Sequence, residues 1–325
     1  MGADVRSVGP AAGRIRILAP LEQKGPPMTI ATPTAQSWGK LSEPIRSDAA
    51  GVDDPVWKDN AYLSFWDSDA AVFGTVHVST SPNAPDTRRA RFSVSVAGRV
   101  TEVVETLEVG TFSSESIHFG LDGRVRVDHP LVSAELVNAP LFAAADYAAN
   151  NAIPALGAAA PLQHFQQACT VTGNVTVDGT TVTTAGRGMR DRTWGFRDES
   201  SQWVEFAALF AVDESAFVTA MKFRHADDSL TADGFVIDSA GSTAITAITF
   251  ARDAAARFRW ARLHLEDDTT RLVSLGARLG GFRVPAGPAE TDGPALGVYD
   301  DFLSFDTDGR GGEGIFEQAI LHRVA

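Results

Sequence analysis

Short runs of alternating apolar and polar residues follow one another from Trp57 to the end of the chain, with turn residues between them. In residues 91–96, for example, every second residue is apolar, as expected of a strand with one buried face. Asp-Gly pairs at 122–123 and 178–179 separate such runs, and Asp-Gly favours the tight turn of a β-hairpin. Since the runs do not alternate with long helical patterns, the sequence excludes a doubly wound parallel sheet and predicts a mainly β protein.

An alanine-rich stretch at residues 139–168 interrupts this pattern, and its prolines and glycine limit any helix to about two or three turns. We therefore predict two β domains, at residues 50–140 and 165–325, each folded as a barrel or sandwich. Residues 141–164 are predicted to form a linker with a short helix that bridges the packed domains. Residues 1–45 are rich in Pro, Gly, Ala, Ser and Thr, which predicts a disordered lead-in.

The balance of charge restricts the binding partners. The 325 residues include 28 Lys and Arg against 41 Asp and Glu, a formal net charge of −13. Such a chain lacks the clustered cations that bind nucleic acid or an anionic membrane. No stretch approaches the ~18 apolar residues of a membrane-spanning helix, and the apolar residues 17–21 are too few for a secretory signal. We therefore expect a cytoplasmic protein without nucleic-acid partners or stable membrane insertion; the sequence decides neither its oligomeric state nor whether Met28 is the natural start.

The densest group of chemically active side chains lies in residues 186–203. In an extended strand, one face of this segment carries three large side chains: Arg190, Arg192 and Trp194. The other face carries Asp191 and Thr193. One interpretation is a pocket floor with Asp191 as acid or base and Trp194 lining an apolar site. The other is a structural ion-pair network at the junction between the domains.

Aromatic residues are concentrated in residues 57–67. If this segment is extended, Tyr62 and Trp66 share one face and Phe65 points the other way. An aromatic wall with a few polar groups is typical of a small-molecule pocket, and equally of a β-barrel core. His77 lies opposite the valines of its own run, so it points either into a cavity or into water.

Motifs for metal, nucleotide or nucleophile chemistry are missing. No two of the seven histidines have the spacing of a zinc site, and the single cysteine, Cys169, excludes an intrachain disulfide. The glycines at 186–188 and 309–314 lack the lysine and helix of a phosphate-binding loop. We therefore expect neither a metal nor a cofactor. Three pairs of adjacent aspartates are typical of solvated turns: 227–228, 267–268 and 300–301.

Two segments, RDRTWGFRD at 190–198 and WKDNAYLSFWD at 57–67, resemble the carotenoid 1,2-hydratase (hydroxyneurosporene synthase) superfamily of two-domain lipocalin-like proteins. HVSTSPN at 77–83 and a GxGxxE pattern at 312–317 strengthen the match. The resemblance covers roughly residues 55–325 and is strongest to uncharacterised bacterial members; the wider group also includes fungal lipocalin-like Diels–Alderases.

This resemblance implies two lipocalin-like β domains and an apolar pocket served by the segment around Asp191, which matches an acidic residue of the hydratases. In the hydratases an aromatic residue stands two positions before that acid, and a histidine follows it. This chain has Met189 and Arg192 instead. The implied reactions are therefore wider than carotenoid hydration.

We predict a cofactor-independent enzyme that hydrates, isomerises or cyclises an apolar small molecule of terpenoid, polyketide-like or steroid-like type. Asp191 is predicted to act as the acid–base group. The other predicted site residues are Arg192 and Trp194 for catalysis, and Tyr62, Trp66, His77, Arg190 and Arg197 for substrate binding. The alternative is a non-catalytic lipocalin-like carrier of a hydrophobic metabolite, and a purely structural interaction module is a third interpretation. The sequence does not separate a hydro-lyase, isomerase or cyclase from a carrier.

Overall fold

The computed structural model describes residue 41 and residues 50–54, 56–84, 88–108, 110–147, 163–196, 203–285 and 295–322. This part of the chain forms eighteen strands and contains no α-helix. No helical segment of a length and apolarity that would cross a bilayer occurs among these residues. The mainly β fold predicted from the sequence is confirmed.

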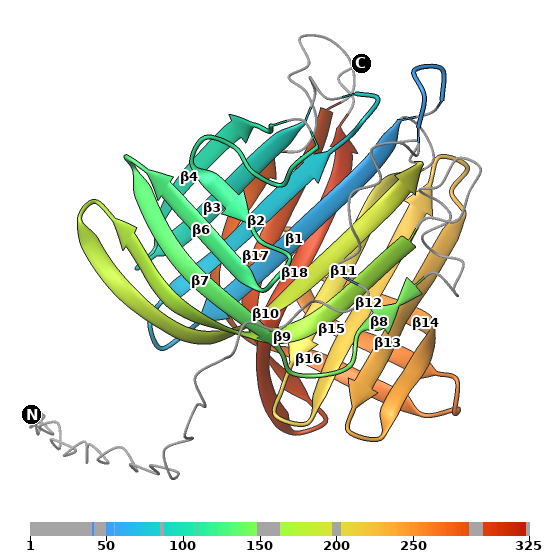
Figure 1. Cartoon of the computed structure of the whole chain (residues 1–325). Coiled ribbons are helices and arrows are strands. Elements are labelled where there is room, and N and C mark those ends of the chain that lie inside the picture. The colour runs from blue at the N-terminus through green and yellow to red at the C-terminus, as the bar shows by residue number, and fades with distance from the viewer. Residues whose placement is uncertain are drawn as a thin grey trace, which may run out of the picture. The chain divides into compact units, whose positions relative to one another are not determined.

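The first ten strands form one antiparallel sheet, in which β4, β3, β2, β1, β10, β9, β7, β6 and β5 are neighbours in that order and β8 pairs with β9 (Figure 1). Their bounds are β1 (Trp57–Asp67), β2 (Val72–Thr80), β3 (Arg89–Val96), β4 (Arg99–Thr106), β5 (Ile117–Phe119), β6 (Arg124–His129), β7 (Val132–Pro140), β8 (Ala145–Asp146), β9 (Gln163–Val177) and β10 (Thr180–Phe196). Glu105 in β4 accepts hydrogen bonds from Ser114 and Ser116, which precede β5. The two edges of the sheet therefore approach each other, and the sheet is nearly closed.

The last eight strands form a closed antiparallel barrel in chain order, because β18 pairs back onto β11. Their bounds are β11 (Trp203–Val212), β12 (Ala216–His225), β13 (Leu230–Asp238), β14 (Gly241–Arg252), β15 (Phe258–Leu265), β16 (Thr270–Pro285), β17 (Ala295–Thr307) and β18 (Arg310–His322). A Cβ atom on Gly314 would lie 1.8 Å from the carbonyl oxygen of Phe210 in β11, so this close approach of β18 requires glycine. Closure of the barrel thus explains one glycine of the GxGxxE pattern.

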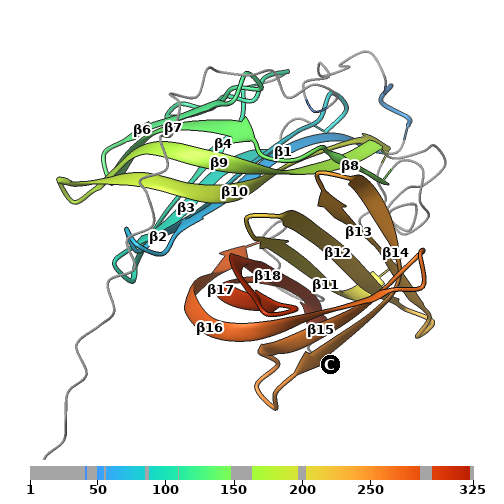
Figure 2. The ribbon, with the colours of Figure 1, turned by 90° about the horizontal axis from the view of Figure 1, so that it is seen from below.

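The first sheet packs over one side of the barrel (Figure 2), and the two faces of these strands form three apolar clusters. One fills the interior of the ten-stranded sheet and includes Phe65, and another fills the barrel and includes Phe316. The third, which we call the interface cluster, lies where the sheet meets the barrel; it joins Trp66 and Met189 of the sheet to Phe302 of the barrel. The two barrel-like units predicted from the sequence are confirmed.

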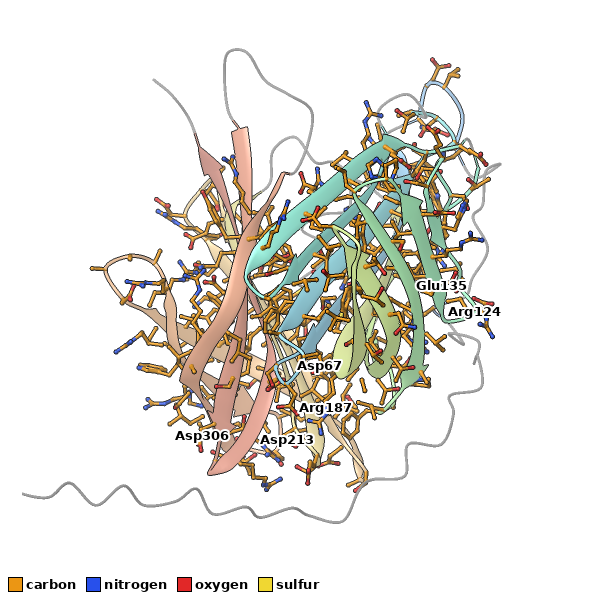
Figure 3. The ribbon with its side chains drawn as sticks, turned by 90° about the vertical axis from the view of Figure 1, so that its left-hand side faces the viewer. Asp67, Arg124, Glu135, Arg187, Asp213 and Asp306 are labelled. Atoms are coloured by element: carbon orange, nitrogen blue, oxygen red, sulfur yellow. The ribbon has the colours of Figure 1, made fainter. Side chains whose placement is uncertain are left out.

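Polar contacts in the first half of β10 connect it to its neighbours; two of the side chains involved, Asp67 and Arg187, are labelled in Figure 3. Asp67 at the end of β1 accepts hydrogen bonds from the Thr184 hydroxyl at 3.1 Å and from the backbone N–H of Ala185 at 2.8 Å. Arg187 donates to the carbonyl oxygen of Val212 in β11 at 3.3 Å. These bonds hold β1 and β10 together and tie β10 to the barrel.

The Asp178-Gly179 pair forms the hairpin turn that the sequence predicts. Both residues have positive φ, 51° at Asp178 and 75° at Gly179, as a type I′ turn requires. The turn joins β9 to β10, and both strands belong to the first sheet, although the predicted C-terminal domain begins at residue 165. Alternation alone assigns no strand to a particular sheet, which is why the sequence did not show this pairing. The predicted helix of the linker lies largely in residues 148–162, outside the described residues.

Leu41 falls within the segment predicted to be a disordered lead-in, yet its side chain is fully buried in the interior of the first sheet. Its carbonyl oxygen accepts a hydrogen bond of 2.8 Å from Nη1 of Arg192. The packed part of the chain therefore includes residue 41. The sequence of residues 1–45 hid this contact because one leucine makes no periodic pattern.

Replacing Leu41 with alanine is expected to lower the free energy of unfolding by about 2–4 kcal/mol, because the substitution leaves a cavity in a closed core. Denaturant titration of the full chain measures this loss. Deletion of residues 1–32 serves as the control and should leave the unfolding midpoint unchanged. A Leu41→Ala protein as stable as the wild type would show that this contact does not form in solution.

Candidate functional site

Strands β1 and β10 run side by side with Tyr62 directly opposite Asp191. Both residues lie on the face of the sheet that meets the barrel, as do Trp66 and Met189. Trp194 packs on the other face, in the interior of the sheet. The alternation predicted for both segments is confirmed.

Arg192 forms a buried ion pair inside the first sheet, on the side away from Asp191. Its Nη2 lies 2.7 and 2.9 Å from the two carboxylate oxygens of Asp59, and neither side chain reaches solvent. Its guanidinium also lies over the rings of Phe112 and Trp194, at 4.8 and 5.3 Å from their centroids. Burial raises the pKa of Asp59 to about 6, although Arg192 lowers it. The structure thus separates Arg192 and Trp194 from the acid with which the sequence grouped them.

Arg190 is also buried on the interior face, where Gln167 and Asn138 accept hydrogen bonds from its guanidinium at 2.7–3.0 Å. Burial lowers its pKa to about 10. It therefore lies away from the predicted substrate. Arg197, the remaining predicted binding residue, is outside the described residues. Near the start of the next strand, Glu205 pairs with Arg252 at 2.5 Å.

Asp191 is almost fully buried and accepts hydrogen bonds from two side chains of its own sheet. Gln166 Nε2 donates to its Oδ2 at 3.1 Å, and the Thr193 hydroxyl donates to its Oδ1 at 3.2 Å. His164 Nε2 lies 3.2 Å from Oδ2, within ion-pair distance. The hydroxyl of Thr193 has one proton, which it gives to Asp191, and its oxygen therefore accepts from Nδ1 of His164.

The hydrogen bonds continue from Asp191 across to the barrel. Gln166 accepts a hydrogen bond from the hydroxyl of Thr219 in β12, and this hydroxyl lies 2.7 Å from the phenol oxygen of Tyr147. Burial raises the pKa of Tyr147 well above its usual range, so its phenol stays neutral. The Tyr147 ring packs 5.1 Å from that of His164. Side chains of β9, β10 and β12, together with Tyr147 just after β8, thus hold the Asp191 carboxylate in one orientation.

His164, Gln166 and Tyr147 were missed in the sequence because they lie in or beside the alanine-rich stretch that was interpreted as a linker. His164 and Gln166 are two positions apart in an extended segment, and β9 places both next to β10. In the sequence, the segment QHFQ shows two polar residues spaced to share one face of a strand. That they lie beside Asp191 follows only from the pairing of β9 with β10.

Two further carboxyl groups face Tyr62 from the barrel. Asp300 in β17 and Glu317 in β18 are direct cross-strand neighbours. Asp300 is 1% exposed, and neither of its oxygens has a hydrogen-bond partner in the described part of the chain. Burial raises its pKa well above the usual range, and Glu317 and Asp301 raise it further. Burial and the nearby Asp191 raise the pKa of Glu317 to about 7.

The aspartates at 300–301 were therefore wrongly predicted as a solvated turn: they are buried within a strand. The pairs at 227–228 and 267–268 are exposed turns, as predicted. Composition does not distinguish the three pairs. The distinguishing signal is the context, because Tyr299, Phe302, Leu303 and Phe305 around the third pair continue a strand pattern.

Glu317 makes the stability of the fold depend on pH in a defined direction. Its pKa of about 7 lies above its ordinary value of 4.5, so its contribution is complete below pH 4.5 and is lost as the pH rises through 7. This amounts to at most about 3 kcal/mol, and partial exposure of the side chain reduces it to about 1–2 kcal/mol.

Glu317→Gln is therefore expected to be more stable than the wild type at pH 8 and to lose less stability between pH 5 and 8. Denaturant titrations at the two pH values measure the difference. Glu135→Gln, which changes an exposed carboxylate, is the control. Equal pH dependence of the wild type and Glu317→Gln would contradict the assignment.

The predicted binding residues Tyr62, Trp66 and His77 lie with Asp191 on the barrel-facing side. The Tyr62 and His77 rings are cross-strand neighbours, with centroids 6.1 Å apart. Trp66 is 1% exposed within the interface cluster. Burial and the carboxylates of Asp300, Glu317 and Asp191 raise the pKa of Tyr62 well above its usual range. The structure thus brings together Asp191, Tyr62, Trp66 and His77 of the eight predicted site residues.

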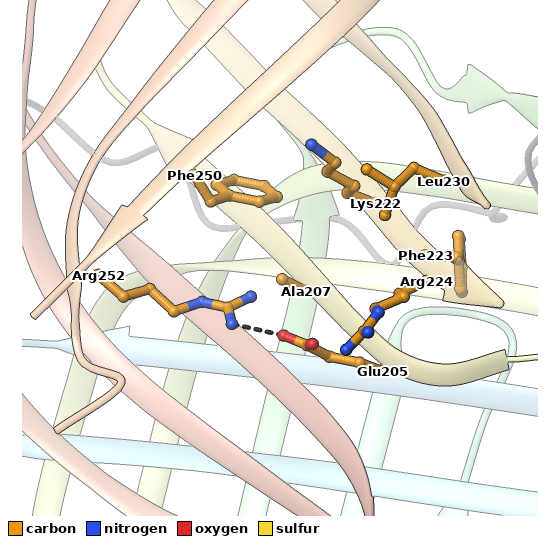
Figure 4. A pocket seen from close by; sticks show the side chains of 8 residues that line it. All are labelled: Glu205, Ala207, Lys222, Phe223, Arg224, Leu230, Phe250 and Arg252. Atoms are coloured by element: carbon orange, nitrogen blue, oxygen red, sulfur yellow. Dashed lines mark hydrogen bonds and ion pairs between the residues drawn. The ribbon is translucent and has the colours of Figure 1, made fainter. Parts of the chain in front are cut away.

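A separate cavity of about 260 Å³ opens at one end of the barrel (Figure 4). Besides the Glu205–Arg252 ion pair, Lys222 lines it and donates to the carbonyl oxygen of Ile248 at 2.9 Å. Its remaining lining residues are Ala207, Phe223, Arg224, Leu230 and Phe250. This charged cavity differs from the apolar pocket expected from the sequence, whereas the interface between sheet and barrel combines aromatic, apolar and acid–base groups.

Among the described residues, no three His, Cys, Asp or Glu side chains are placed to hold a metal ion. Cys169 is buried, and burial raises its pKa to about 12. At that pKa the sulfur remains a thiol at neutral pH and is a poor nucleophile.

Known proteins support the fold. A family model described as a domain of unknown function (DUF7064) matches residues 46–321. An AttH-like protein from Nitrosomonas europaea superposes with a TM-score of 0.58 at 16% identity, covering 88% of this chain and 98% of that one. Kievitone hydratase from Nectria haematococca gives 0.56 at 12% identity, covering 88% and 96%. CghA in complex with Sch210972 gives 0.59 at 14% identity, covering 83% and 89%. No curated protein matches by sequence.

Proposed function

Since this chain belongs to the DUF7064 family, whose fold is shared with kievitone hydratase and CghA, we propose that it is a cofactor-independent acid–base enzyme. Its substrate is an apolar small molecule, and its reaction is a hydration, isomerisation or cyclisation. The substrate lies between the sheet and the barrel, against Tyr62 and Trp66. Asp191 is the base of this reaction.

The observation that carries the proposal is the position of the Asp191 carboxylate. It is buried beside an apolar cluster, accepts hydrogen bonds from Gln166 and Thr193, and lies 3.2 Å from His164 Nε2. A fixed base in a water-poor site is effective in proton abstraction, since little reorganisation accompanies the transfer. Arg190 and Arg192, the arginines nearest to Asp191 in the sequence, make their contacts on the other face of the sheet.

Glu317 is the complementary acid, because a carboxyl with a pKa of about 7 is partly protonated at neutral pH. In a hydration, Glu317 gives its proton to one alkene carbon. Water adds through its oxygen to the other carbon, and Asp191 takes the proton that water releases. In an isomerisation, Asp191 removes a proton from one carbon and Glu317 supplies one to another. Exchange with solvent restores both carboxyl groups.

Two proteins with the same fold support an apolar small molecule as the substrate. One is named as a hydratase of kievitone, and another holds the small molecule Sch210972. At 12–16% identity these two proteins and the AttH-like protein share the fold with this chain. The proposed reaction is therefore argued from the residues of this chain described above.

The test is native mass spectrometry of the purified full chain, followed by identification of any extracted apolar metabolite. That metabolite and its unsaturated precursor are then incubated with the protein in ¹⁸O-labelled water and in D₂O. A hydratase introduces ¹⁸O, and an isomerase or a cyclase using proton transfer introduces deuterium. Release of the metabolite with neither label nor rearrangement would establish the carrier instead.

A further inference from the structure

Asp300 presents an unsatisfied polar group to the proposed site. Its side chain is 1% exposed, and neither oxygen takes part in a hydrogen bond within the described residues. Its neighbour in β17, Asp301, instead faces the other side of the strand and pairs with Arg278. A buried polar atom without a partner costs free energy, so an unpaired carboxyl at this position needs a reason.

The groups around Asp300 favour its neutral form. Tyr62 of β1 and Glu317 of β18 lie near it, and Glu317 is its direct cross-strand neighbour, so the two carboxyl groups do not readily ionise together. Arg91 of β3 is the cation that acts on Asp300, and it also lies 3.9 Å from Glu102. His77 of β2 lies beside Tyr62. Burial and the neighbouring carboxyls outweigh Arg91, and the pKa of Asp300 is raised.

Aromatic rings lie along the same face of β17 as Asp300. Phe302 lies two positions along the same face of β17, with its ring 5.3 Å from that of Phe73 and 5.5 Å from that of Phe282. An O–H group in such surroundings binds strongly to an acceptor oxygen, because water competes little for it. A bound ligand with a single oxygen beside apolar carbon atoms satisfies both the carboxyl and the rings.

We propose that Asp300 holds a carbonyl or hydroxyl oxygen of the substrate through its buried, unpartnered carboxyl group, so that the substrate class is an apolar molecule with one oxygen near its reacting carbons. This inference rests on the proposed function in its choice of site. Asp191 and Glu317 transfer protons at carbon, whereas Asp300 binds and polarises the oxygen. Asp300 is therefore a substrate-binding residue that needs no charge change during the reaction.

The test uses β-ionone, a terpenoid ketone, as probe and the full-length chain with three substitutions. Asp300→Asn keeps an N–H donor, Asp300→Leu removes the polar group, and Asp301→Asn is the control on the opposite face. Quenching of tryptophan fluorescence reports binding. We expect Asp300→Leu to weaken β-ionone binding at least tenfold, with Asp300→Asn within about threefold of the wild type and Asp301→Asn unchanged.

Infrared spectroscopy gives a second readout that does not involve turnover. The wild type at pH 7 should show the carbonyl bands of protonated carboxyl groups, to which Glu317 also contributes, and β-ionone should shift the part due to Asp300. Asp300→Asn should lack this ligand-sensitive part, and Asp301→Asn should retain it. Asp300→Leu should melt no lower than the wild type, since it removes an unsatisfied polar group. Three results would overturn the inference. They are equal β-ionone binding by Asp300→Leu and the wild type, no β-ionone binding by any of the proteins, and a ligand-sensitive carbonyl band that Asp300→Asn does not change. A failure to find turnover would contradict the proposed reaction, but it would not change the β-ionone binding or the infrared band that test Asp300.

Discussion

Asp191→Asn is expected to reduce turnover of the identified substrate by about 10²–10⁴-fold, the usual effect of removing an acid–base group. Asparagine has nearly the same shape, so the backbone of β10 should not move. Its amide nitrogen, however, would face the amide nitrogen of Gln166, which donates to Asp191, and would lie near His164 Nε2. We therefore expect the free energy of unfolding to fall by about 1–2 kcal/mol, far less than would unfold the protein.

The measurement compares single-turnover rates and denaturation midpoints for the wild type and Asp191→Asn. Asp128→Asn, which changes an exposed carboxylate in β6, is the matched control. It should change neither the single-turnover rate nor the denaturation midpoint. Thr193→Val should lower the rate less than Asp191→Asn, because it removes one donor and leaves the base. Turnover by Asp191→Asn within threefold of the wild type would exclude Asp191 as the base.

The local part of the site could be predicted from the sequence. The period of two in residues 57–67 and 190–194 correctly places Tyr62 and Trp66 on one face and Arg192 and Trp194 on the opposite face from Asp191. It also gives the hairpin turn at Asp178-Gly179. These features depend only on backbone geometry and on neighbours along the chain.

The other half of the site depends on pairings between distant segments. Asp300 and Glu317 reach Asp191 only because the barrel packs on the sheet, more than a hundred residues later in the chain. His164 reaches it because β9 pairs with β10. A pattern of alternation carries no information on which strands become neighbours. The sequence therefore groups Asp191 with the arginines beside it, although the side chains that hold it come from another strand.

The same separation of faces assigns Arg192 a structural role that can be tested. Arg192→Met is expected to lower the free energy of unfolding by about 3–5 kcal/mol, because it leaves the Asp59 carboxylate buried without its cation. The carbonyl oxygen of Leu41 also loses its donor. Arg126→Met in β6 is the control: its ion pairs with Asp128 and Glu135 are exposed, and the loss should stay below about 1 kcal/mol.

The dependence of this loss on pH identifies its cause. Without Arg192, which lowers the pKa of Asp59, that pKa should rise further above its value of about 6. A folded-state pKa above the unfolded one favours folding at low pH, and this contribution is lost as the pH rises through the folded value. Arg192→Met should therefore be closest to the wild type near pH 5 and least stable near pH 8, and Asp59→Asn in the same chain should remove most of this difference. A loss that is equal at both pH values would mean that Arg192 stabilises the sheet through packing on Phe112 and Trp194 rather than through its charge.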